Sequence, residues 1–468
     1  MELPYDKTDR QSIVAYAKKL VGHTLNEMCD SQLVRGYNEK SKGRFGNVLE
    51  EGYFLYKCNS NPECDFPEAG LELKSTPLKK LARDEKYVAK ERLVLSIIDY
   101  NEIVKQEFKT SPLFMKSSAL LLICYLYEKD KDFLDYIIHL ADQWEFPESD
   151  LAVIRKDWET IRGKVLAGKA HEITESDTYY LAACTKGASA DSLRDQPKSS
   201  VKAKQRAYSL KQSYLNYIIL SLAGGDTKYG RLLSTPKVAE EQGIEEYALS
   251  KFQPYLGMPE LEILSTLGLE SKVRAKSYYA GLVNSIMNID VNFEIEEFVK
   301  ADVEIKTIRV SKTGTIREHI SFPAFKYEDI LEEEWETSLF YRQISRKFMF
   351  VFFKEQEDST YVLEKVSFWN MPQQDLDKVE EVWDNVYDCV LTGRIVEKIE
   401  DGRRYTNFTK ATDNPISHIR PHAQTKEDTY PLPIPDQLTQ ATEYTKHCIW
   451  LDRKYVLDNI YKEQLKEY

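Results

Sequence analysis

Apolar and polar residues alternate along the chain in a way that predicts both helices and short strands. In residues 11–21, apolar side chains recur every three to four positions, which predicts an amphipathic helix. A second helix is expected after Gly46. Short apolar or alternating runs bounded by turn residues predict strands at 71–75, 91–98 and 119–127. This mixture predicts an α/β fold, with a mixed sheet flanked by helices.

The rest of the chain continues this pattern. In the first half we expect a helix at 156–166, a strand at 179–184 and a helix at 207–222 that is entered from a loop. The glycine-rich run at 223–230 is the clearest break. Beyond it the pattern predicts, in order, a helix near 274–289, strands at 303–310 and 348–354, a helix near 373–391 and a final helix at 453–466.

Length and the central break together indicate more than one domain. The chain has 468 residues, more than a single hydrophobic core usually supports. We therefore predict a lobe at 1–224, a connecting segment at 225–255 and a second lobe at 256–468.

Composition indicates the cellular compartment in which the protein is expected. No apolar run approaches the roughly 20 residues that span a bilayer, and the N-terminus lacks the pattern of a signal peptide. We therefore expect no membrane association. The seven cysteines are scattered without CxxC spacing, which speaks against a structural zinc site or a disulfide framework. A reducing cytoplasm fits this cysteine usage.

The distribution of charge along the chain is more informative about a nucleic-acid partner than the net charge. The net charge of −12 by itself counts against a nucleic-acid partner. Binding to DNA depends on local basic patches, however, and lysine and arginine are concentrated at 74–92 and 198–211. The alternative interpretation of both clusters is an ordinary solvated surface.

The strongest local signal is the segment DFPEAGLELK at 65–74. Residues two apart in a strand share a face, so Glu72 and Lys74 are expected to point the same way. Pro67 and Gly70 allow a turn that returns Asp65 beside Glu72. Two carboxylates and one ammonium group would then converge.

This convergence suits metal-dependent hydrolysis of a phosphodiester. Mg²⁺ prefers oxygen ligands, which Asp65, Glu72 and the backbone carbonyl of Leu73 would supply. The ion would lower the pKa of an attacking water, and Lys74 would orient that water or offset charge in the transition state. Glu-x-Lys is a common triplet, and a salt-bridged strand edge is the alternative interpretation.

A second motif lies upstream of this strand. The segments GRFGNVLE (43–50) and DFPEAGLELKSTP (65–77) resemble the active-site motifs of the MutH-like endonucleases, G-x-x-G-x-x-L-E followed by D-x6-E-x-K. The resemblance implies a restriction-endonuclease-like core. It also implies that Glu50 is a helix carboxylate of the active site and a possible further metal ligand, beside Asp65, Glu72 and Lys74.

The resemblance extends to regions that read DNA in this family. It implies that Lys186 contacts base edges and that Arg206, Ser209 and Lys211 contact bases or phosphates. The sequence departs from the single-lobe repair members here. It has Cys184-Thr185-Lys186 where they carry Arg-Pro-Lys, and Ser209 where they carry tyrosine.

The second half resembles a degenerate copy of the first. In EFVKADVEIKTI (297–308), Glu297, Glu304 and Lys306 stand for Asp65, Glu72 and Lys74. The expected helix carboxylate is replaced by Ser285. These matches predict an internal duplication with a second lobe that binds DNA without cutting it. A second active site at Glu304 and Lys306 is the alternative.

The resemblance also covers the end of the chain. HIRPHA (418–423) matches the position of the first DNA-reading loop, which makes Arg420 and His422 the predicted DNA contacts of the second lobe. Two-lobed members of the family are type II restriction enzymes that cut double-stranded DNA at GATC, with an allosteric DNA-binding lobe.

A restriction role predicts a cognate DNA methyltransferase that acts on the same site, and either two chains that meet on DNA or one chain that nicks twice in succession. Symmetric cutting of a palindrome also favours a two-fold arrangement of protein. Two alternatives stay open at this point. One is a mismatch-repair nicking endonuclease, and the other is a DNA-binding methylation sensor that does not cut.

Overall fold

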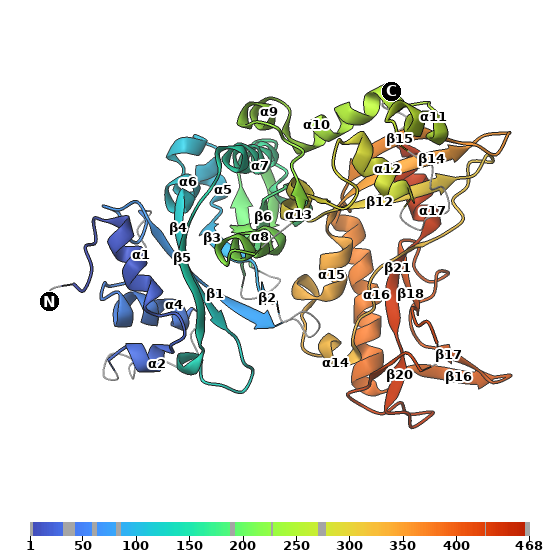
Figure 1. Ribbon diagram of the computed structural model, residues 1–468. Coiled ribbons are helices and arrows are strands. Elements are labelled where there is room, and N and C mark those ends of the chain that lie inside the picture. Colours follow the sequence, from blue (N-terminus) through green and yellow to red (C-terminus); the bar gives the residue numbers. More distant parts are fainter. Residues whose placement is uncertain are drawn as a thin grey trace. The chain divides into compact units, whose positions relative to one another are not determined.

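A computed structural model describes residues 3–30, 43–58, 63–80, 86–187, 192–225, 228–269, 278–425 and 427–463. The chain forms two compact units with mixed sheets flanked by helices, as the sequence pattern predicts (Figure 1). Unit 1 comprises Met1–Tyr247 and Asn292–Asp302, and unit 2 comprises Ala248–Val291 and Val303–Tyr468. A short stretch beyond the middle of the chain therefore belongs to unit 1.

The main sheet of unit 1 has the strand order β2-β1-β4-β5. Strands β1 (Glu72–Lys80) and β4 (Ala119–Leu126) run parallel at its centre. Strands β2 (Tyr87–Ala89) and β5 (Ile138–Glu145) are antiparallel to them at the edges. The apolar run that predicts β4 is buried from Ala119 to Cys124, as expected for a central strand covered on both faces.

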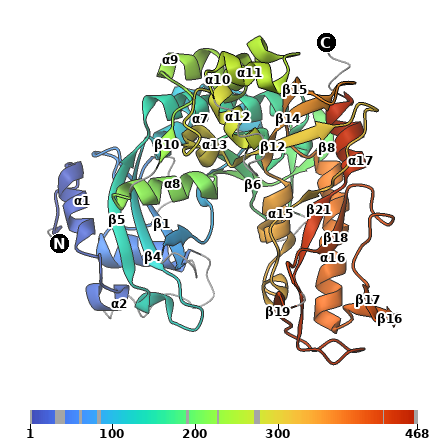
Figure 2. The ribbon, with the colours of Figure 1, turned by 45° about the vertical axis from the view of Figure 1, so that its right-hand side comes forward.

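Helices cover this sheet. Helix α1 (Arg10–Lys18) begins at Asp9, whose side chain accepts the backbone N–H of Gln11. Helix α4 (Arg44–Val48) continues into a π-helical turn, η1 (Leu49–Tyr53). Helix α8 (Gln212–Leu222) lies along the sheet, and its Asn216 Oδ1 accepts the backbone N–H of Ala89 in β2 at 2.7 Å (Figure 2).

A second sheet of unit 1 joins β3 (Leu93–Ile97), β9 (Arg206–Leu210) and β6 (Leu181–Thr185). The predicted helix at 207–222 is wrong in its first turn, because β9 occupies the central place of this sheet and pairs on both sides. Lys211 alone separates β9 from α8. No glycine or proline marks this change from strand to helix, so the apolar spacing reads as one continuous helix.

Unit 2 has a similar arrangement of strands. Strands β12 (Val303–Val310) and β14 (Lys347–Glu355) are parallel, and β15 (Tyr361–Trp369) is antiparallel to β14. The long helix α16 (Gln373–Thr392) follows β15 and buries an apolar stripe that includes Leu376, Trp383 and Val390. It ends at Gly393, whose φ of 64° is the left-handed conformation typical of a helix C-terminus.

The second sheet of unit 2 joins β13 (Ile320–Ser321), β21 (His447–Leu451) and β18 (Ser417–Pro421). Helix α17 (Arg453–Tyr455) and a π-helical turn, η8 (Val456–Tyr461), follow β21. The predicted final helix therefore exists, in a shorter form. Its remaining predicted residues from 464 onward lie outside the described part of the chain.

The two units share an order of elements. In each, a parallel strand pair is followed by an antiparallel strand and a long helix, here α7 (Glu148–Leu166) and α16. In each unit, the central strand of the second sheet, β9 or β21, ends in a leucine that pairs with a residue of each neighbouring strand. Leu210 pairs with Leu93 and Leu181, and Leu451 pairs with Ile320 and Ser417. This is the arrangement expected from the predicted duplication, which stays a prediction.

The remaining elements are short. In unit 1 they are α2 (Leu25–Met28), α5 (Tyr100–Ile103), α6 (Pro112–Ser117), β7 (Leu193–Gln196), β8 (Ser199–Lys204), β10 (Tyr229–Gly230), α9 (Pro236–Glu241), β11 (Glu294–Ile295) and α13 (Glu296–Ala301), with α10 (Gly243–Phe252) at the unit boundary. In unit 2 they are α11 (Glu260–Thr266), α12 (Tyr278–Ile286), α14 (Tyr327–Ile330), α15 (Leu339–Ile344), β16 (Val396–Glu400), β17 (Arg403–Thr406), β19 (Thr429–Pro431) and β20 (Glu443–Thr445). Within the described residues, no helix has the length and hydropathy needed to cross a membrane.

Candidate active site

A tight turn places Asp65 beside strand β1. Phe66 and Leu71 pair across this turn, and Gly70 adopts a φ of 61° that favours glycine. Oδ2 of Asp65 accepts the backbone N–H of Leu73 at 2.9 Å. This hydrogen bond fixes Asp65 next to the backbone of Leu73, whose carbonyl is the predicted metal ligand.

Glu72 and Lys74 form a close pair on β1. The Lys74 ammonium group lies 2.5 Å from Oε1 of Glu72, and the ammonium group of Lys116 lies 3.9 Å from the same oxygen. Glu72 is only 2% exposed, and its Oε2 is buried without a hydrogen-bond partner. A buried carboxylate oxygen without a partner is costly, and a bound cation would relieve that cost.

Glu50 projects from the π-helical turn η1 toward the same charges. Burial is the main cause that raises its pKa, and the charge of Asp65 raises it further, while Lys74 opposes the rise. The pKa of Glu72 is also raised, first by burial, with Lys74 opposing and Asp65 adding to the rise. Asp65 therefore interacts electrostatically with both Glu50 and Glu72, and the three carboxylates form one negative centre.

Tyr56 belongs to this centre, although the sequence analysis does not identify it. Its hydroxyl is buried without a hydrogen-bond partner, and its pKa is raised by burial and by the charges of Asp65, Glu50 and Glu72. Leu55 positions it through a left-handed backbone with a φ of 60°. The backbone N–H of Tyr56 then donates to the carbonyl of Glu50 at 3.0 Å. No spacing rule in the sequence predicts this conformation.

The donor set at this centre fits a hard divalent cation. Three carboxylates supply the oxygen ligands that Mg²⁺ prefers, and the oxygen of Glu72 without a partner is available for coordination. The oxygens of the three carboxylates do not converge closely enough to form a complete metal-binding cluster in this structure. Among the described residues, one group of three ligating side chains has its ligand atoms within 4.8 Å of one another, and it lies in unit 2.

Comparison with known proteins identifies the family. The model of the family described as DNA mismatch repair enzyme MutH matches residues 54–157 and 290–381. The type II restriction enzyme Sau3AI of Staphylococcus aureus is 33% identical, over 96% of this chain and 97% of that enzyme. The chain belongs to the MutH-like restriction endonucleases.

More distant relatives match a smaller part of the chain. The DNA mismatch repair protein MutH of Shewanella woodyi is 25% identical over 41% of this chain, and that of Shigella flexneri is 28% identical over 40%. The matches cover 82% and 79% of those proteins. The prediction of an enzyme of the site-specific deoxyribonuclease class is confirmed by this family membership.

The predicted DNA-reading residues of this endonuclease fall into two groups. Lys186 is exposed directly after β6 and is available to a ligand. Lys211 is occupied, because its ammonium group donates to the carbonyls of Thr178 at 2.7 Å and Ala301 at 3.0 Å. A phosphate contact by Lys211 would therefore break two internal hydrogen bonds.

Arg206 and Ser209 are at odds with a role in direct DNA contact. Arg206 is 4% exposed and donates to the carbonyl of Ala183 at 2.5 Å, and Ser209 is fully buried beside Ala182. The cause is the central position of β9, whose side chains are covered by the rest of unit 1. The sequence analysis places these residues in an accessible loop and helix, whereas the structure places them in a strand.

The predicted contacts of the second half lie at the end of β18. His422 is exposed, with its ring 6.3 Å from that of Trp450. Arg420 is half-buried, and its Nη2 lies 3.3 Å from Nε2 of His319. His422 is therefore directly available to a ligand, while Arg420 already has a partner.

Unit 2 retains part of the catalytic pattern of the endonuclease with a different charge. The ammonium group of Lys306 lies 2.5 Å from Oε1 of Glu304, and Arg346 lies 2.6 Å from its Oε2. These two cations lower the pKa of Glu304, although burial opposes the effect. A single carboxylate faces two cations here, so the local charge is positive where that of unit 1 is negative.

The other predicted counterparts in the second half have structural roles. Glu297 accepts the backbone N–H groups of Leu232 and Leu233, both at 2.8 Å, within unit 1. Both oxygens of Glu297 are therefore used by the fold and are not available to a metal ion. Ser285 donates to the carbonyl of Gly281 at 2.9 Å and carries no charge.

Proposed function

We propose that the protein is a type II restriction endonuclease that hydrolyses double-stranded DNA with Mg²⁺ at the centre in unit 1. The observation that carries this proposal is the buried Glu72, in a chain of this family, which has one oxygen paired with Lys74, the other without a partner, and the charge of Asp65 acting on it as it acts on Glu50. Structural ion pairs give no reason to gather three mutually repelling carboxylates, whereas a bound divalent cation would offset their repulsion.

Each residue has a distinct task in the proposed mechanism. Asp65, Glu72 and the carbonyl of Leu73 would hold the ion, and Glu50 would be a further ligand or would act through a water molecule. Bound Mg²⁺ supplies Lewis-acid activation of the phosphoryl group and of a water molecule. Lys74 would orient the attacking water or stabilise the transition state. The Tyr56 hydroxyl, which has no partner in this structure, would be free to donate to one of the carboxylates.

The proposed target is a short palindrome, GATC. The support is the resemblance of the sequence to the two-lobed, GATC-cutting branch of the family, together with the match over almost the whole length of a type II restriction enzyme. A repair-type nicking role has less support, since the MutH relatives match about two fifths of the chain. A restriction role also implies a cognate DNA methyltransferase and a cytoplasmic location.

Plasmid digestion tests this proposal. Unmethylated plasmid is incubated with Mg²⁺ and either the full chain or its Asp65→Ala variant, and the fragment ends are sequenced. Discrete fragments that end at GATC, absent without metal and absent with the variant, are the expected result. Fragments at another sequence would retain the mechanism and reject the specificity. Gel retardation without cutting by either protein would reject the nuclease assignment of this site in favour of a DNA-binding sensor.

We propose that unit 2 binds DNA as an effector and does not cut it. The support is the inverted charge at Glu304, Lys306 and Arg346, which suits a phosphate better than a metal ion. The exposed His422 and the nearby Arg420 are the proposed further contacts. Binding of a second copy of the site would favour association of two chains on DNA.

The effector role is tested in the full chain. The variants Arg420→Ala and His422→Ala are compared with the parent on plasmids that carry one or several sites. The expected result is an unchanged rate on the one-site plasmid and a loss of the acceleration by additional sites. If both variants keep the full acceleration, Arg420 and His422 are not the effector contacts.

A further inference from the structure

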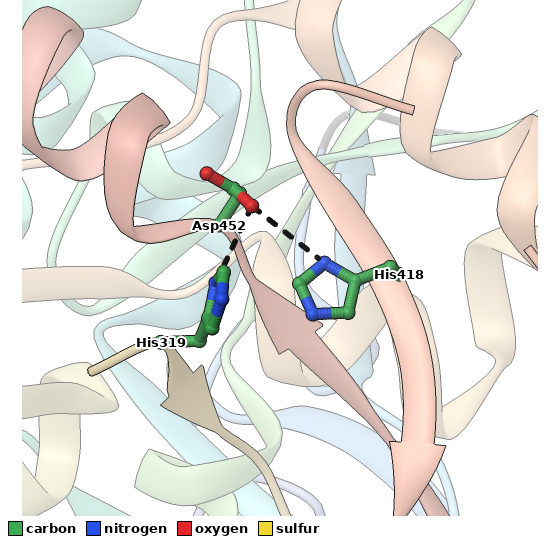
Figure 3. Close-up of side chains that lie close together, drawn as sticks. All are labelled: His319, His418 and Asp452. Atoms are coloured by element: carbon green, nitrogen blue, oxygen red, sulfur yellow. Dashed lines mark ion pairs between the residues drawn. The ribbon is translucent and has the colours of Figure 1, made fainter. Parts of the chain in front are cut away.

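Three side chains of unit 2 converge from distant parts of the sequence. His418 lies in β18, His319 directly precedes β13, and Asp452 directly follows β21. Oδ2 of Asp452 lies 3.3 Å from Nδ1 of His319 and 3.9 Å from Nδ1 of His418. Figure 3 shows the two imidazole rings on either side of the carboxylate. The ring centroids are 4.7 Å apart, and the rings are nearly perpendicular.

His418 is the unusual member of this cluster. Its side chain is fully buried, and neither ring nitrogen has a hydrogen-bond partner. Burial is the main cause that lowers its pKa to about 4, and the charge of Arg420 adds to this effect. The ring is therefore neutral at pH 7, with a free lone pair. A buried imidazole without a partner is costly to the fold, and its lone pair is available to a metal ion.

The distances between the donor atoms suit a small cation. Ligands about 2.0 to 2.1 Å from a tetrahedral Zn²⁺ lie about 3.3 Å from one another. The ligand atoms of His319, His418 and Asp452 all lie within 4.8 Å of one another, so a small inward shift would complete the set. Oδ1 of Asp452 already accepts the backbone N–H of Lys454 at 2.7 Å, which holds the carboxylate in place.

We propose that His319, His418 and Asp452 bind a divalent transition-metal ion, with Zn²⁺ as the preferred ion and water or another ligand in the fourth position. Two imidazoles and one carboxylate favour Zn²⁺ over Mg²⁺ or Ca²⁺, which prefer oxygen donors. The same donor set also suits Fe²⁺. The site contains no cysteine, so cysteine spacing gives no indication of it.

This site is a property of unit 2 and has no counterpart in unit 1. The strand pairing of Leu451 with Ile320 and Ser417 matches that of Leu210 with Leu93 and Leu181. By this register, His319, His418 and Asp452 occupy the places of Arg92, Ala182 and Lys211, respectively. None of the three residues in unit 1 is a metal ligand. The site is therefore separate from the Mg²⁺ centre proposed for unit 1.

Two groups compete with a metal ion at His319. Nδ1 of His319 accepts the backbone N–H of Arg453 at 3.1 Å, and Nε2 faces Nη2 of Arg420 at 3.3 Å. A neutral imidazole has one lone pair on its ring nitrogens, so it cannot accept from both donors. Coordination through Nδ1 places the ring proton on Nε2, where it opposes Arg420. Metal binding is therefore expected to release Arg420 from His319.

Zinc titration of the full chain tests the proposal. The Asp65→Ala variant serves as the parent, so that the proposed centre in unit 1 contributes less to binding. Metal-free parent is titrated with ZnCl₂ by calorimetry, and bound metals are identified by mass spectrometry. We expect one equivalent of Zn²⁺ that is lost in His418→Ala. In His319→Ala, we expect an affinity lower by at least about 100-fold, the upper range for loss of an outer-sphere partner alone.

Matched variants separate coordination from general damage. His422→Ala removes an exposed histidine outside the cluster and should leave zinc binding unchanged. Arg420→Met should tighten binding by at least about threefold, because it removes a nearby positive charge. Since His418→Ala can fail to fold, the half-buried His319 provides the second test. Co²⁺ bound by the parent should give the intense visible absorption of a tetrahedral complex, and His319→Ala should lose it.

The proposal is overturned by two results. One is a parent that binds no Zn²⁺ or Fe²⁺ at micromolar concentrations. The other is a folded His319→Ala variant, verified by circular dichroism, that binds Zn²⁺ as tightly as its parent.

Discussion

Lys74 donates to one oxygen of Glu72 across 2.5 Å, while the other oxygen of Glu72 is buried without a partner. The same side-chain pair recurs in unit 2 as Lys306 and Glu304, where Arg346 binds the second oxygen. The difference between the two arrangements is one available oxygen. In unit 1 that oxygen can coordinate a cation, and in unit 2 it is already neutralised.

Loss of the lysine ammonium group should distinguish the two pairs. We expect Lys74→Met to lower the single-turnover rate of DNA cleavage by about 10²- to 10³-fold, because the variant loses a group that stabilises the transition state. Lys306→Met is the matched control and should keep the parental rate on a one-site substrate. Comparable losses in both variants would indicate that unit 2 cuts DNA as well.

Cleavage should depend on pH through the carboxylates that bind the metal. The pKa values of Glu50 and Glu72 are both raised, mainly by burial, so lowering the pH protonates them earlier than ordinary glutamates. Protonated carboxyl groups bind Mg²⁺ poorly. We expect the apparent Mg²⁺ affinity, measured from the cleavage rate against Mg²⁺ concentration, to fall as the pH decreases from neutrality. Glu50→Gln should flatten this dependence.

The same shifts have a consequence for the metal-free protein. A carboxyl group with a raised pKa in the folded state binds protons more tightly when folded than when unfolded. Its contribution to stability therefore increases as the pH falls through the folded-state pKa. Thermal unfolding without Mg²⁺ should show a relative gain in stability at mildly acidic pH, and saturating Mg²⁺ should reduce that gain. A pH dependence that is the same with and without Mg²⁺ would argue against metal binding at Glu50 and Glu72.

Two lysines of the predicted DNA-reading region should behave differently. Lys186 is exposed, so Lys186→Ala should weaken DNA binding and reduce the slope of log affinity against log salt by about 1. Lys211 is bound to two internal carbonyls, so Lys211→Ala should lower the stability of unit 1. Fluorescence anisotropy at several salt concentrations and urea unfolding measure the two effects. The assignment fails if Lys186→Ala leaves the salt dependence of DNA binding unchanged.

A buried ion triad fastens residues 292–302 to unit 1. The ammonium group of Lys300 lies 2.9 Å from Asp150 and 2.7 Å from Glu296, and its side chain is 3% exposed. Lys300→Ala leaves both carboxylates without this partner, which should lower the free energy of unfolding by about 3 to 5 kcal/mol. In the exposed pair Lys237 and Glu241, Lys237→Ala should cost less than about 1 kcal/mol. Urea unfolding of both variants makes the comparison, and equal losses would contradict the triad's role.

The strand that carries Glu72 and Lys74 could be predicted from local pattern. A period of two places Glu72 and Lys74 on one face, and Pro67 and Gly70 indicate the turn that returns Asp65. These are short-range geometric rules, and the structure obeys them. Tyr56 could not be predicted, because its position depends on the left-handed backbone of Leu55. Nothing in the residue type of a leucine indicates that conformation.

The burial of Arg206 and Ser209, two of the predicted DNA-contacting residues, could not be predicted from the sequence either. Arg206 and Ser209 have polar side chains, which normally indicate an accessible surface. They are buried because β9 is paired on both sides, a long-range arrangement that involves strands far away in the sequence. The cluster of His319, His418 and Asp452 escaped prediction for the same reason, since its members meet only through strand pairing.

The return of residues 292–302 to unit 1 has a consequence for biosynthesis. Unit 1 cannot be completed by the first 247 residues, because Lys300 and Glu297 arrive only after part of unit 2 has been synthesised. During translation, Asp150 therefore lacks its ion-pair partner Lys300 until α13 has been synthesised. No single cleavage of the chain separates the two units intact, and a gene fragment that ends at residue 224 would encode an incomplete nuclease.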